Sequence, residues 1–149
     1  MKTYAVFDID GTIADCNHRL SHAQMKEWDT FHSKAAEDAV VKDIADLMIH
    51  AASFYDIILL TGRNERYRKL TEEWLDSTNL NYYVHKILMR PDDDWSHDYE
   101  MKITLLEKEL GSKEAVLQKV AFVIDDRDSV VEGLRNYGLT VLQCSQGGY

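Results

Sequence analysis

Short apolar runs alternate along the chain with longer stretches in which apolar residues recur every three or four positions. The short runs are typical of buried strands, and the longer recurrence is typical of helices that pack on one face. This pattern predicts strands at residues 3–7, 56–60, 83–88, 120–124 and 139–142. It predicts helices at residues 40–52, from Asn64 onwards, at residues 98–110, and from Asp128 or Ser129 to Tyr137.

The ends of these helices carry residue types that suit them. Asn64, Asp128 and Ser129 are typical N-caps, because a short polar side chain accepts a hydrogen bond from the first free backbone N–H groups. Gly111 and Gly138 are typical of the residue that follows a helix. The apolar face of the 40–52 helix is expected to consist of Val40, Val41, Ile44, Leu47, Met48 and Ala51. The face of the next helix is expected to consist of Tyr67, Leu70, Trp74 and Leu75.

Strands that alternate with helices favour a doubly wound α/β fold with a central parallel sheet of about five strands. The 149 residues suit a single domain, which we expect to span residues 1–149. Residues 15–38 are polar and aromatic, and we expect a small helical cap or lid there, mostly helical around residues 21–35. Trp28 and Phe31 lie three residues apart on one face of this helix, which favours packing over base stacking.

Composition narrows the functional classes. The net charge of −9 disfavours an extended nucleic-acid-binding surface, because such surfaces are basic. An anionic substrate would therefore be held locally, by a metal and a few arginines. No run of 18 apolar residues occurs and a strand is predicted from residue 3, so we expect neither a membrane span nor a signal peptide. Cys16 and Cys144 form no disulfide framework or metal motif, so we expect reduced thiols and a cytoplasmic protein.

Polar residues stand at the ends of four predicted strands. Asp8 and Asp10 follow the first strand, residues 61–63 (Thr-Gly-Arg) the second, Arg90 the third and residues 125–127 (Asp-Asp-Arg) the fourth. Because ligands bind beyond the carboxyl ends of parallel strands, these groups are expected to converge on one crevice. Alternate strand residues face the same way, so Asp8 and Asp10 form a carboxylate pair. Such a pair suits a divalent cation or acid–base chemistry.

Four motifs resemble those of the haloacid dehalogenase-like (HAD) phosphohydrolases. They are Asp8-Ile9-Asp10-Gly11-Thr12, Leu60-Thr61-Gly62-Arg63, Lys102 and Asp125-Asp126. A closer resemblance is to the 3′-phosphatase domain of phage-type polynucleotide kinase/phosphatases. It rests on Arg19, Thr61-Gly62-Arg63, Met89-Arg90, Asp98, Asp125-Asp126-Arg127 and Gly147-Gly148-Tyr149. The kinase loop Gly-x-x-x-x-Gly-Lys-Ser/Thr does not occur in these 149 residues, so ATP-dependent phosphorylation is not expected of them.

The resemblance implies a three-layer HAD-like fold and a Mg2+-dependent phosphomonoesterase. Asp8 would be the nucleophile that forms an aspartyl-phosphate, and Asp10 would protonate the leaving oxygen and then deprotonate the attacking water. Mg2+ would be held by the Asp8 side chain, the Asp10 backbone carbonyl and one carboxylate of the Asp125/Asp126 pair. Lys102 would hold the phosphate and the Asp8 carboxylate together.

Two further positions concern the phosphate and the lysine. Thr61 offers a hydroxyl and a backbone N–H to phosphate oxygens, and Gly62 allows close approach. Asp98 lies one helical turn before Lys102 and is expected to fix that lysine by an i,i+4 ion pair.

The substrate itself would be recognised by arginines. The resemblance implies that Arg19, Arg63 and Arg90 line the site, where guanidinium groups bind phosphate and stack on bases. The expected substrate is a phosphomonoester on a nucleic-acid 3′ end or a nucleotide. One alternative is a HAD phosphatase of small nucleotides or other metabolites. Another is a non-catalytic phospho-acceptor module, which the placement of the Asp-x-Asp motif on the first strand disfavours. A dehalogenase is disfavoured by Asp10, because a departing halide needs no acid.

Overall fold

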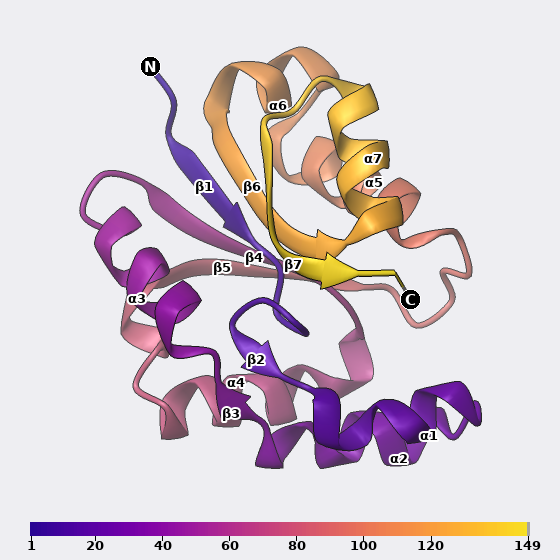
Figure 1. Cartoon of the computed structure of the whole chain (residues 1–149). Coiled ribbons are helices and arrows are strands. Elements are labelled where there is room, and N and C mark those ends of the chain that lie inside the picture. Colours follow the sequence, from indigo (N-terminus) through magenta and orange to yellow (C-terminus); the bar gives the residue numbers. More distant parts are fainter. Residues whose placement is uncertain (149) are drawn as a thin grey trace.

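A parallel sheet of five strands forms the centre of the fold (Figure 1). The computed structural model describes residues 1–148, and the strands run in the order β5-β4-β1-β6-β7 across the sheet. They are β1 (Tyr4–Phe7), β4 (Asp56–Asn64), β5 (Val84–Arg90), β6 (Val120–Arg127) and β7 (Val141–Gly147). The chain runs outward from β1 through β4 to β5 and then returns to β6 on the other side of β1. This reversal places a ligand crevice at the carboxyl end of β1.

Helices cover both faces of the sheet (Figure 1). One face packs against α3 (Lys42–Ala51) and α4 (Arg68–Ser77), and the other against α5 (Asp98–Leu110), α6 (Lys113–Lys119) and α7 (Asp128–Tyr137). Alternation along β1 feeds both cores, because Ala5 and Phe7 join the first and Val6 joins the second. The predicted three-layer, doubly wound fold is confirmed.

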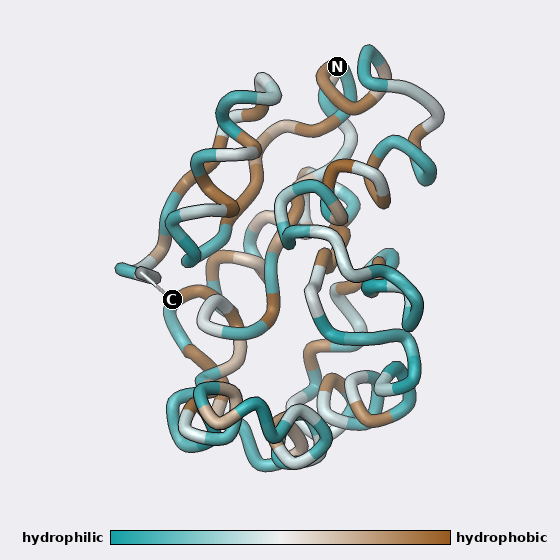
Figure 2. The backbone as a smooth tube through the Cα atoms, turned by 90° about the vertical axis from the view of Figure 1, so that its right-hand side faces the viewer, coloured by the Kyte–Doolittle hydropathy of each residue, from teal (hydrophilic) through white to brown (hydrophobic). Residues whose placement is uncertain are grey.

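Burial follows the hydropathy pattern. β4 is apolar on both faces, and Ile57, Ile58, Leu59 and Leu60 are all buried because helices cover each side of the strand. The helices alternate between hydrophobic and hydrophilic residues around the outside of the molecule (Figure 2). Among the described residues, no helix combines the length and the apolar character that crossing a bilayer requires.

A small hairpin and several short helices separate β1 from α3. β2 (Ala14–Asp15) pairs antiparallel with β3 (Ala39–Val40). Between them lie η1 (Asn17–Arg19), α1 (Leu20–Gln24), α2 (Trp28–Ser33) and η2 (Lys34–Glu37). We call residues 16–38 the helical insert. The hairpin escaped prediction because strands of two residues are too short to show a period. The role of the insert as a cap or lid remains a prediction.

Several boundaries differ from the sequence prediction. The helix predicted from residue 40 begins at Lys42, because Val40 pairs in β3 and Val41 has an extended backbone. Leu47 is 43% exposed and therefore does not belong to the apolar face. β4 and β6 continue beyond their predicted ends because their neighbours β5 and β7 continue to pair with them. β7 begins at Val141 rather than at residue 139.

The predicted glycines occur at the helix C-termini, but the predicted N-caps do not form. Gly111 and Gly138 follow α5 and α7 with φ of 106° and 117°, which confirms both predictions. Asn64 precedes η3 (Glu65–Tyr67) and forms no side-chain cap, and α7 likewise begins without one, so the predicted caps are wrong. A 3-10 turn, η4 (Asn81–Tyr83), leads into β5. Helix α6 was not predicted, although Ser112 caps it by accepting a hydrogen bond from the Ala115 N–H.

Gly147 ends β7 against the backbone of β6. A Cβ atom at residue 147 would lie 2.2 Å from the carbonyl oxygen of Asp126, which could yield only if the two strands separated. We expect Gly147→Ala to cost about 1–3 kcal/mol and to lower Tm by several degrees. Gly148→Ala is the matched control, because its nearest neighbour is the Asp128 side chain at 3.7 Å. Thermal unfolding followed by circular dichroism tests this, and equal Tm values for the two variants would contradict it.

Candidate active site

Asp8 and Asp10 lie in the turn that follows β1, at the switch point of the sheet. Ile9 between them is fully buried, so the two aspartates flank a residue that anchors the turn in the core. Gly11 adopts φ of 80°, a left-handed conformation that favours glycine. The Thr12 hydroxyl then donates a hydrogen bond to Asp8 Oδ2 at 3.2 Å. Ile9, Gly11 and Thr12 thus each have a structural role in this turn.

Lys102 of α5 joins carboxylates from two strand ends. Its Nζ lies 2.9 Å from Asp8 Oδ1 and 2.7 Å from Asp125 Oδ2. Burial disfavours the ammonium charge, but Asp125 and Asp8 outweigh it and raise the pKa of Lys102 above its ordinary value. The other Asp125 oxygen accepts the backbone N–H of Arg127 at 3.0 Å. The lysine is therefore a charged group held between two buried acids.

Asp8, Asp125 and Asp126 form a group of three buried carboxylates. Each offers one oxygen, and these three atoms lie within 4.8 Å of one another. Burial and the charge of Asp125 raise the pKa of Asp8 well above its ordinary value, although Lys102 opposes them. A divalent cation would offset this repulsion, and Mg2+ prefers oxygen ligands of this kind. The donor set therefore fits the predicted Mg2+ site.

Asp10 binds two buried arginines. Arg63 Nη2 donates to Asp10 Oδ1 at 2.7 Å, and Arg19 Nη2 donates to the same oxygen at 2.6 Å. Burial raises the pKa of Asp10, but the Arg63 and Arg19 charges outweigh it and hold the pKa well below its ordinary value. Without substrate, Asp10 is therefore ionised and oriented by two guanidinium groups.

Asp38, a residue not predicted for the site, holds the same two arginines from the other side. Its carboxylate accepts hydrogen bonds from Arg19 Nε at 2.8 Å and Nη2 at 2.7 Å, and it lies 3.4 Å from Arg63 Nη2. His18 Nε2 lies 2.7 Å from the same group. The Asp38 side chain is fully buried. No pattern in the sequence singled out Asp38, because the burial of Arg19 and Arg63, which calls for a second carboxylate, is seen only in the structure.

Arg19 and Arg63 were predicted to contact the substrate. Both are buried, with at most 1% of either residue exposed, and their bonds to Asp10 and Asp38 were not anticipated. Contact with the substrate remains a prediction. In the structure, both arginines bond the Asp10 carboxylate and orient it.

Asp98 links two arginines instead of pairing with Lys102. It accepts hydrogen bonds from Arg90 Nη2 on one oxygen and from Arg127 Nη1 on the other. The predicted i,i+4 pair is wrong because Lys102 turns inward to the buried carboxylates, where it gains two partners. Arg127 was not among the predicted site residues, although its place directly after Asp125-Asp126 was a usable signal.

Thr61 and Gly62 lie in the extension of β4. Thr61 is 1% exposed, and its hydroxyl oxygen accepts the backbone N–H of Arg63 at 3.1 Å. Gly62 lies beside the Asp98 carboxylate, which would be 3.5 Å from a Cβ atom at that position. Both residues line the same cavity as Asp8, and their contact with phosphate remains a prediction.

A cavity of about 610 Å³ opens onto these groups, a volume suited to a small ligand. Its polar lining includes Asp8, Asp10, Lys102, Arg90 and Arg127. Its apolar lining includes Leu20, Ala23, Trp28, Phe31 and Trp95. Phe31 is buried and packs edge to face against Trp28, with ring centroids 6.1 Å apart, as predicted. Trp28 is nevertheless 52% exposed.

His32 of the helical insert also lines this cavity. It is 8% exposed, its ring stacks on Tyr67 with centroids 4.5 Å apart, and its Nδ1 has no hydrogen-bond partner in the described part of the chain. Burial is the main reason that the pKa of His32 is lowered to about 4. The ring is therefore neutral at pH 7.

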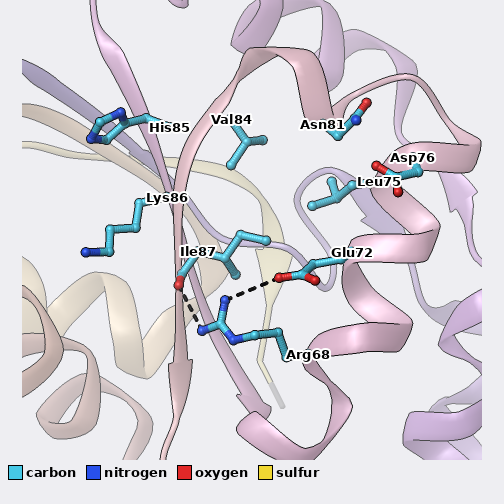
Figure 3. A pocket seen from close by; sticks show the side chains of 9 residues that line it. All are labelled: Arg68, Glu72, Leu75, Asp76, Asn81, Val84, His85, Lys86 and Ile87. Carbon is cyan, nitrogen blue, oxygen red and sulfur yellow. Dashed lines mark hydrogen bonds and ion pairs between the residues drawn. The ribbon is translucent and has the colours of Figure 1, made fainter.

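A second hollow, of about 560 Å³, lies between β5 and α4 (Figure 3). Arg68 donates to the Ile87 carbonyl at 3.1 Å and lies 3.7 Å from Glu72, so charged side chains in this hollow partner one another (Figure 3). None of the predicted site residues lines it. The carboxylate cavity is therefore the candidate active site.

Comparison with known proteins identifies the family. The family described as "Polynucleotide kinase PNKP phosphatase domain" matches residues 2–149. The chain belongs to this family. The predicted resemblance is thereby confirmed, and so is the assignment of this phosphatase domain to the HAD superfamily.

The sequences of individual relatives are consistent with this assignment. A protein of Autographa californica nuclear polyhedrosis virus, named as a bifunctional polynucleotide kinase/RNA ligase, is 28% identical over 126 residues, which are 83% of this chain and 16% of the viral protein. A chain of the Pnkp1/Rnl/Hen1 RNA repair complex is 27% identical with a TM-score of 0.81, over 100% of this chain and 44% of that one. The phosphatase domain thus spans less than half the length of either relative.

A more distant structure shows the fold alone. A HAD hydrolase from Bacillus subtilis, solved with bound magnesium, is 13% identical with a TM-score of 0.67, over 95% of this chain and 86% of that chain. The α/β architecture of the phosphatase domain is therefore shared beyond polynucleotide kinases.

The Asp38 network yields a stability prediction. Asp38→Asn leaves two buried arginines with too little negative charge, and we expect it to cost about 3 kcal/mol. Asp46→Asn is the matched control, because Asp46 forms an exposed pair with Lys42 at 2.6 Å and should cost less than about 0.5 kcal/mol. Urea unfolding at pH 7 measures both. A loss for Asp38→Asn no larger than that of the control would refute the proposed support.

His32 yields a prediction about pH. The folded-state pKa of about 4 lies below the ordinary value of 6.5, so the unfolded chain binds the proton more tightly. His32 therefore costs stability progressively as pH falls below about 6.5, by about 2.5 kcal/mol at pH 4.5. His32→Gln removes this contribution. Urea unfolding from pH 7.5 to 4.5 should show a shallower acid loss for the variant, and parallel curves would be inconsistent with a buried neutral ring.

Proposed function

We propose that this domain is a Mg2+-dependent phosphomonoesterase that works through an aspartyl-phosphate on Asp8, on 3′-phosphorylated nucleic-acid ends or nucleotides. The observation that carries the proposal is the meeting of Asp8, Asp125 and Asp126 with Lys102 at the switch point of the sheet. Phosphoryl transfer needs a positioned nucleophile and neutralisation of charge, and this cluster supplies both.

In the first step, an Asp8 carboxylate oxygen attacks phosphorus. The bond from phosphorus to the ester oxygen breaks, and the leaving oxygen takes a proton from Asp10. Thr12 and Lys102 each bond one Asp8 oxygen, which orients the carboxylate for attack. The Thr61 hydroxyl and backbone N–H are proposed to hold phosphate oxygens.

In the second step, water attacks the phosphorus of the aspartyl-phosphate. Asp10 takes a proton from that water, the bond from phosphorus to Asp8 breaks, and inorganic phosphate leaves with the Asp8 carboxylate restored. The pair Arg19 and Arg63 favours the ionised form of Asp10, which is the form that this second step requires.

The first step requires Asp10 in its protonated form. The bound phosphomonoester favours protonation of Asp10, because its negative charge opposes the arginine charges and raises the pKa of the Asp10 carboxyl. The arginines therefore set the resting state of Asp10, and the substrate changes it. This division of labour explains how one carboxyl group serves as an acid and then as a base.

Mg2+, when bound, would neutralise the repulsion between the Asp8 carboxylate and the phosphate. The Asp8 side chain, the Asp10 backbone carbonyl and one carboxylate of the Asp125/Asp126 pair are the proposed ligands. All are oxygen donors, as Mg2+ prefers. Lys102 supports the same site by reducing the repulsion between Asp8 and Asp125.

The substrate assignment rests on relatives and on charge. The relatives named above are a polynucleotide kinase/RNA ligase and a chain of an RNA repair complex, which favours nucleic-acid ends. The net charge of −9 favours contact with an end rather than with a long backbone. A cavity of about 610 Å³ also favours a second candidate, a free nucleotide.

A substrate panel tests the proposal. Phosphate release is measured from a 3′-phosphorylated oligonucleotide, the same oligonucleotide with a 5′-phosphate, nucleoside 3′- and 5′-monophosphates, and glycerol 2-phosphate. We expect kcat/KM to be roughly tenfold or more higher for the 3′-phosphorylated ends than for the 5′-phosphorylated ones. Chelation of Mg2+ should abolish release, and added Mg2+ should restore it.

The covalent step has its own control. Acid quenching of the wild-type reaction should trap label from a phosphorylated substrate on Asp8, whereas Asp8→Asn should trap none and lose at least about 1,000-fold in kcat. Asp46→Asn, which alters a distant surface carboxylate, should match the wild type. Full turnover by Asp8→Asn would rule out the aspartyl-phosphate, and no release from any substrate would favour the non-catalytic phospho-acceptor module.

A further inference from the structure

Two of the three tryptophans in the chain are exposed to solvent. Trp74 is 2% exposed and donates its indole N–H to the Asp38 carbonyl at 2.9 Å, as a core tryptophan does. Trp28 and Trp95 are 52% and 88% exposed. Both line the cavity that contains Asp8 and Lys102, although they lie 67 positions apart in the sequence. Exposed indole rings that gather at one cavity indicate a binding role.

Each exposed ring is held by residues that also belong to the site. Trp28 packs edge to face on Phe31, with centroids 6.1 Å apart, and Arg19 lies over the Phe31 ring at 4.3 Å. Trp95 lies in the loop between β5 and α5. Arg90 Nη1 donates to the carbonyls of the residues on either side of Trp95, at 3.1 and 2.9 Å. The Phe31 ring thus supports Trp28, and Arg90 fixes the backbone on both sides of Trp95, while each indole stays exposed.

The chemistry of the cavity selects a planar aromatic ligand. The helical insert contributes apolar lining through Leu20, Ala23 and Phe31 beside Trp28, which favours a flat and weakly polar group. The phosphate-binding candidates lie in the same cavity, so the ligand must carry a phosphate as well. A nucleobase attached to a phosphorylated sugar has both parts, and stacking on tryptophan is tolerant of base identity.

Charge argues for a single terminal nucleotide rather than a long strand. The net charge of −9 gives little attraction for a run of phosphates, so affinity has to come from contacts close to the reacting group. Stacking of a base on tryptophan supplies such contacts without requiring many lysine or arginine side chains.

We propose that Trp28 and Trp95 form a platform for the base of the terminal nucleotide, so that the substrate is an unpaired 3′-phosphorylated end or a nucleoside 3′-phosphate. This inference rests on the proposed function, because the phosphate of that terminal nucleotide is the group transferred to Asp8. It predicts weak dependence on base identity, because every base can stack. It also predicts weak dependence on salt, because few phosphates are contacted. It also predicts poor use of ends whose terminal nucleotide lacks a base.

The test uses two single-stranded oligonucleotides that carry a 3′-phosphate and differ only in whether the terminal nucleotide has a base. Wild type should prefer the base-bearing end. Trp28→Ala and Trp95→Ala should each lower kcat/KM on that end about tenfold, roughly 1.4 kcal/mol, and leave the abasic end unchanged. Trp28→Phe and Trp95→Phe should recover most of the loss, because phenylalanine still stacks. Phe54→Ala is the control, since Phe54 is 83% exposed and lies outside the cavity.

A binding measurement separates this inference from the proposed function. Adenosine 3′-monophosphate added to the Asp8→Asn protein should quench indole fluorescence, and the double variant that also lacks Trp28 and Trp95 should lose the quench, with buried Trp74 as background. Cleavage that is independent of both tryptophans, without quenching, would overturn the platform and leave the phosphatase in place. Quenching without any cleavage would support the platform and refute the phosphomonoesterase.

Discussion

The structure of this domain depends on keeping three carboxylates together where little water reaches them. Asp8, Asp125 and Asp126 are each at most 7% exposed, and one oxygen of each lies within 4.8 Å of the others. Like charges at that separation destabilise the fold unless a cation offsets them. Lys102 provides part of that compensation from α5 by bonding Asp8 and Asp125. Because β1, β6 and α5 must all be in place for these contacts, formation of the site and formation of the sheet are coupled.

A second charge network separates the two aspartates of the Asp-x-Asp motif. Asp8 lies among acids and a lysine, and its pKa is raised by burial and by Asp125. Asp10 lies against Arg19 and Arg63, and its pKa is lowered by them in spite of burial. Neighbouring carboxyl groups that differ in this way are suited to different tasks. Asp38 maintains this difference in pKa, because it holds Arg19 and Arg63 in place against Asp10.

The helical insert connects this chemistry to recognition. Arg19 lies within the insert and reaches Asp10 and Asp38, and Phe31 of the same insert lies between that guanidinium and the exposed ring of Trp28. On the β5 side, Arg90 bonds Asp98 and the backbone around Trp95. Arginines near the reacting groups therefore also position the surface that we propose to hold the base. Movement of the insert would displace Asp10, because the Arg19 side chain extends from the insert and bonds Asp10.

The layered fold and the catalytic candidates could be predicted from the sequence, because both rest on local patterns. Short apolar runs mark β1, β4 and β6, and Asp8, Asp10, Thr61 and the Asp125-Asp126 pair stand where those apolar runs end. The pairing of the charged side chains depends on tertiary packing. Asp98 pairs with Arg90 and Arg127 instead of Lys102, and Asp38 joins the arginines from 28 positions beyond Asp10. Tertiary packing also places Trp28 at the cavity. Partners of buried charges are chosen by packing between distant elements, which no local period encodes.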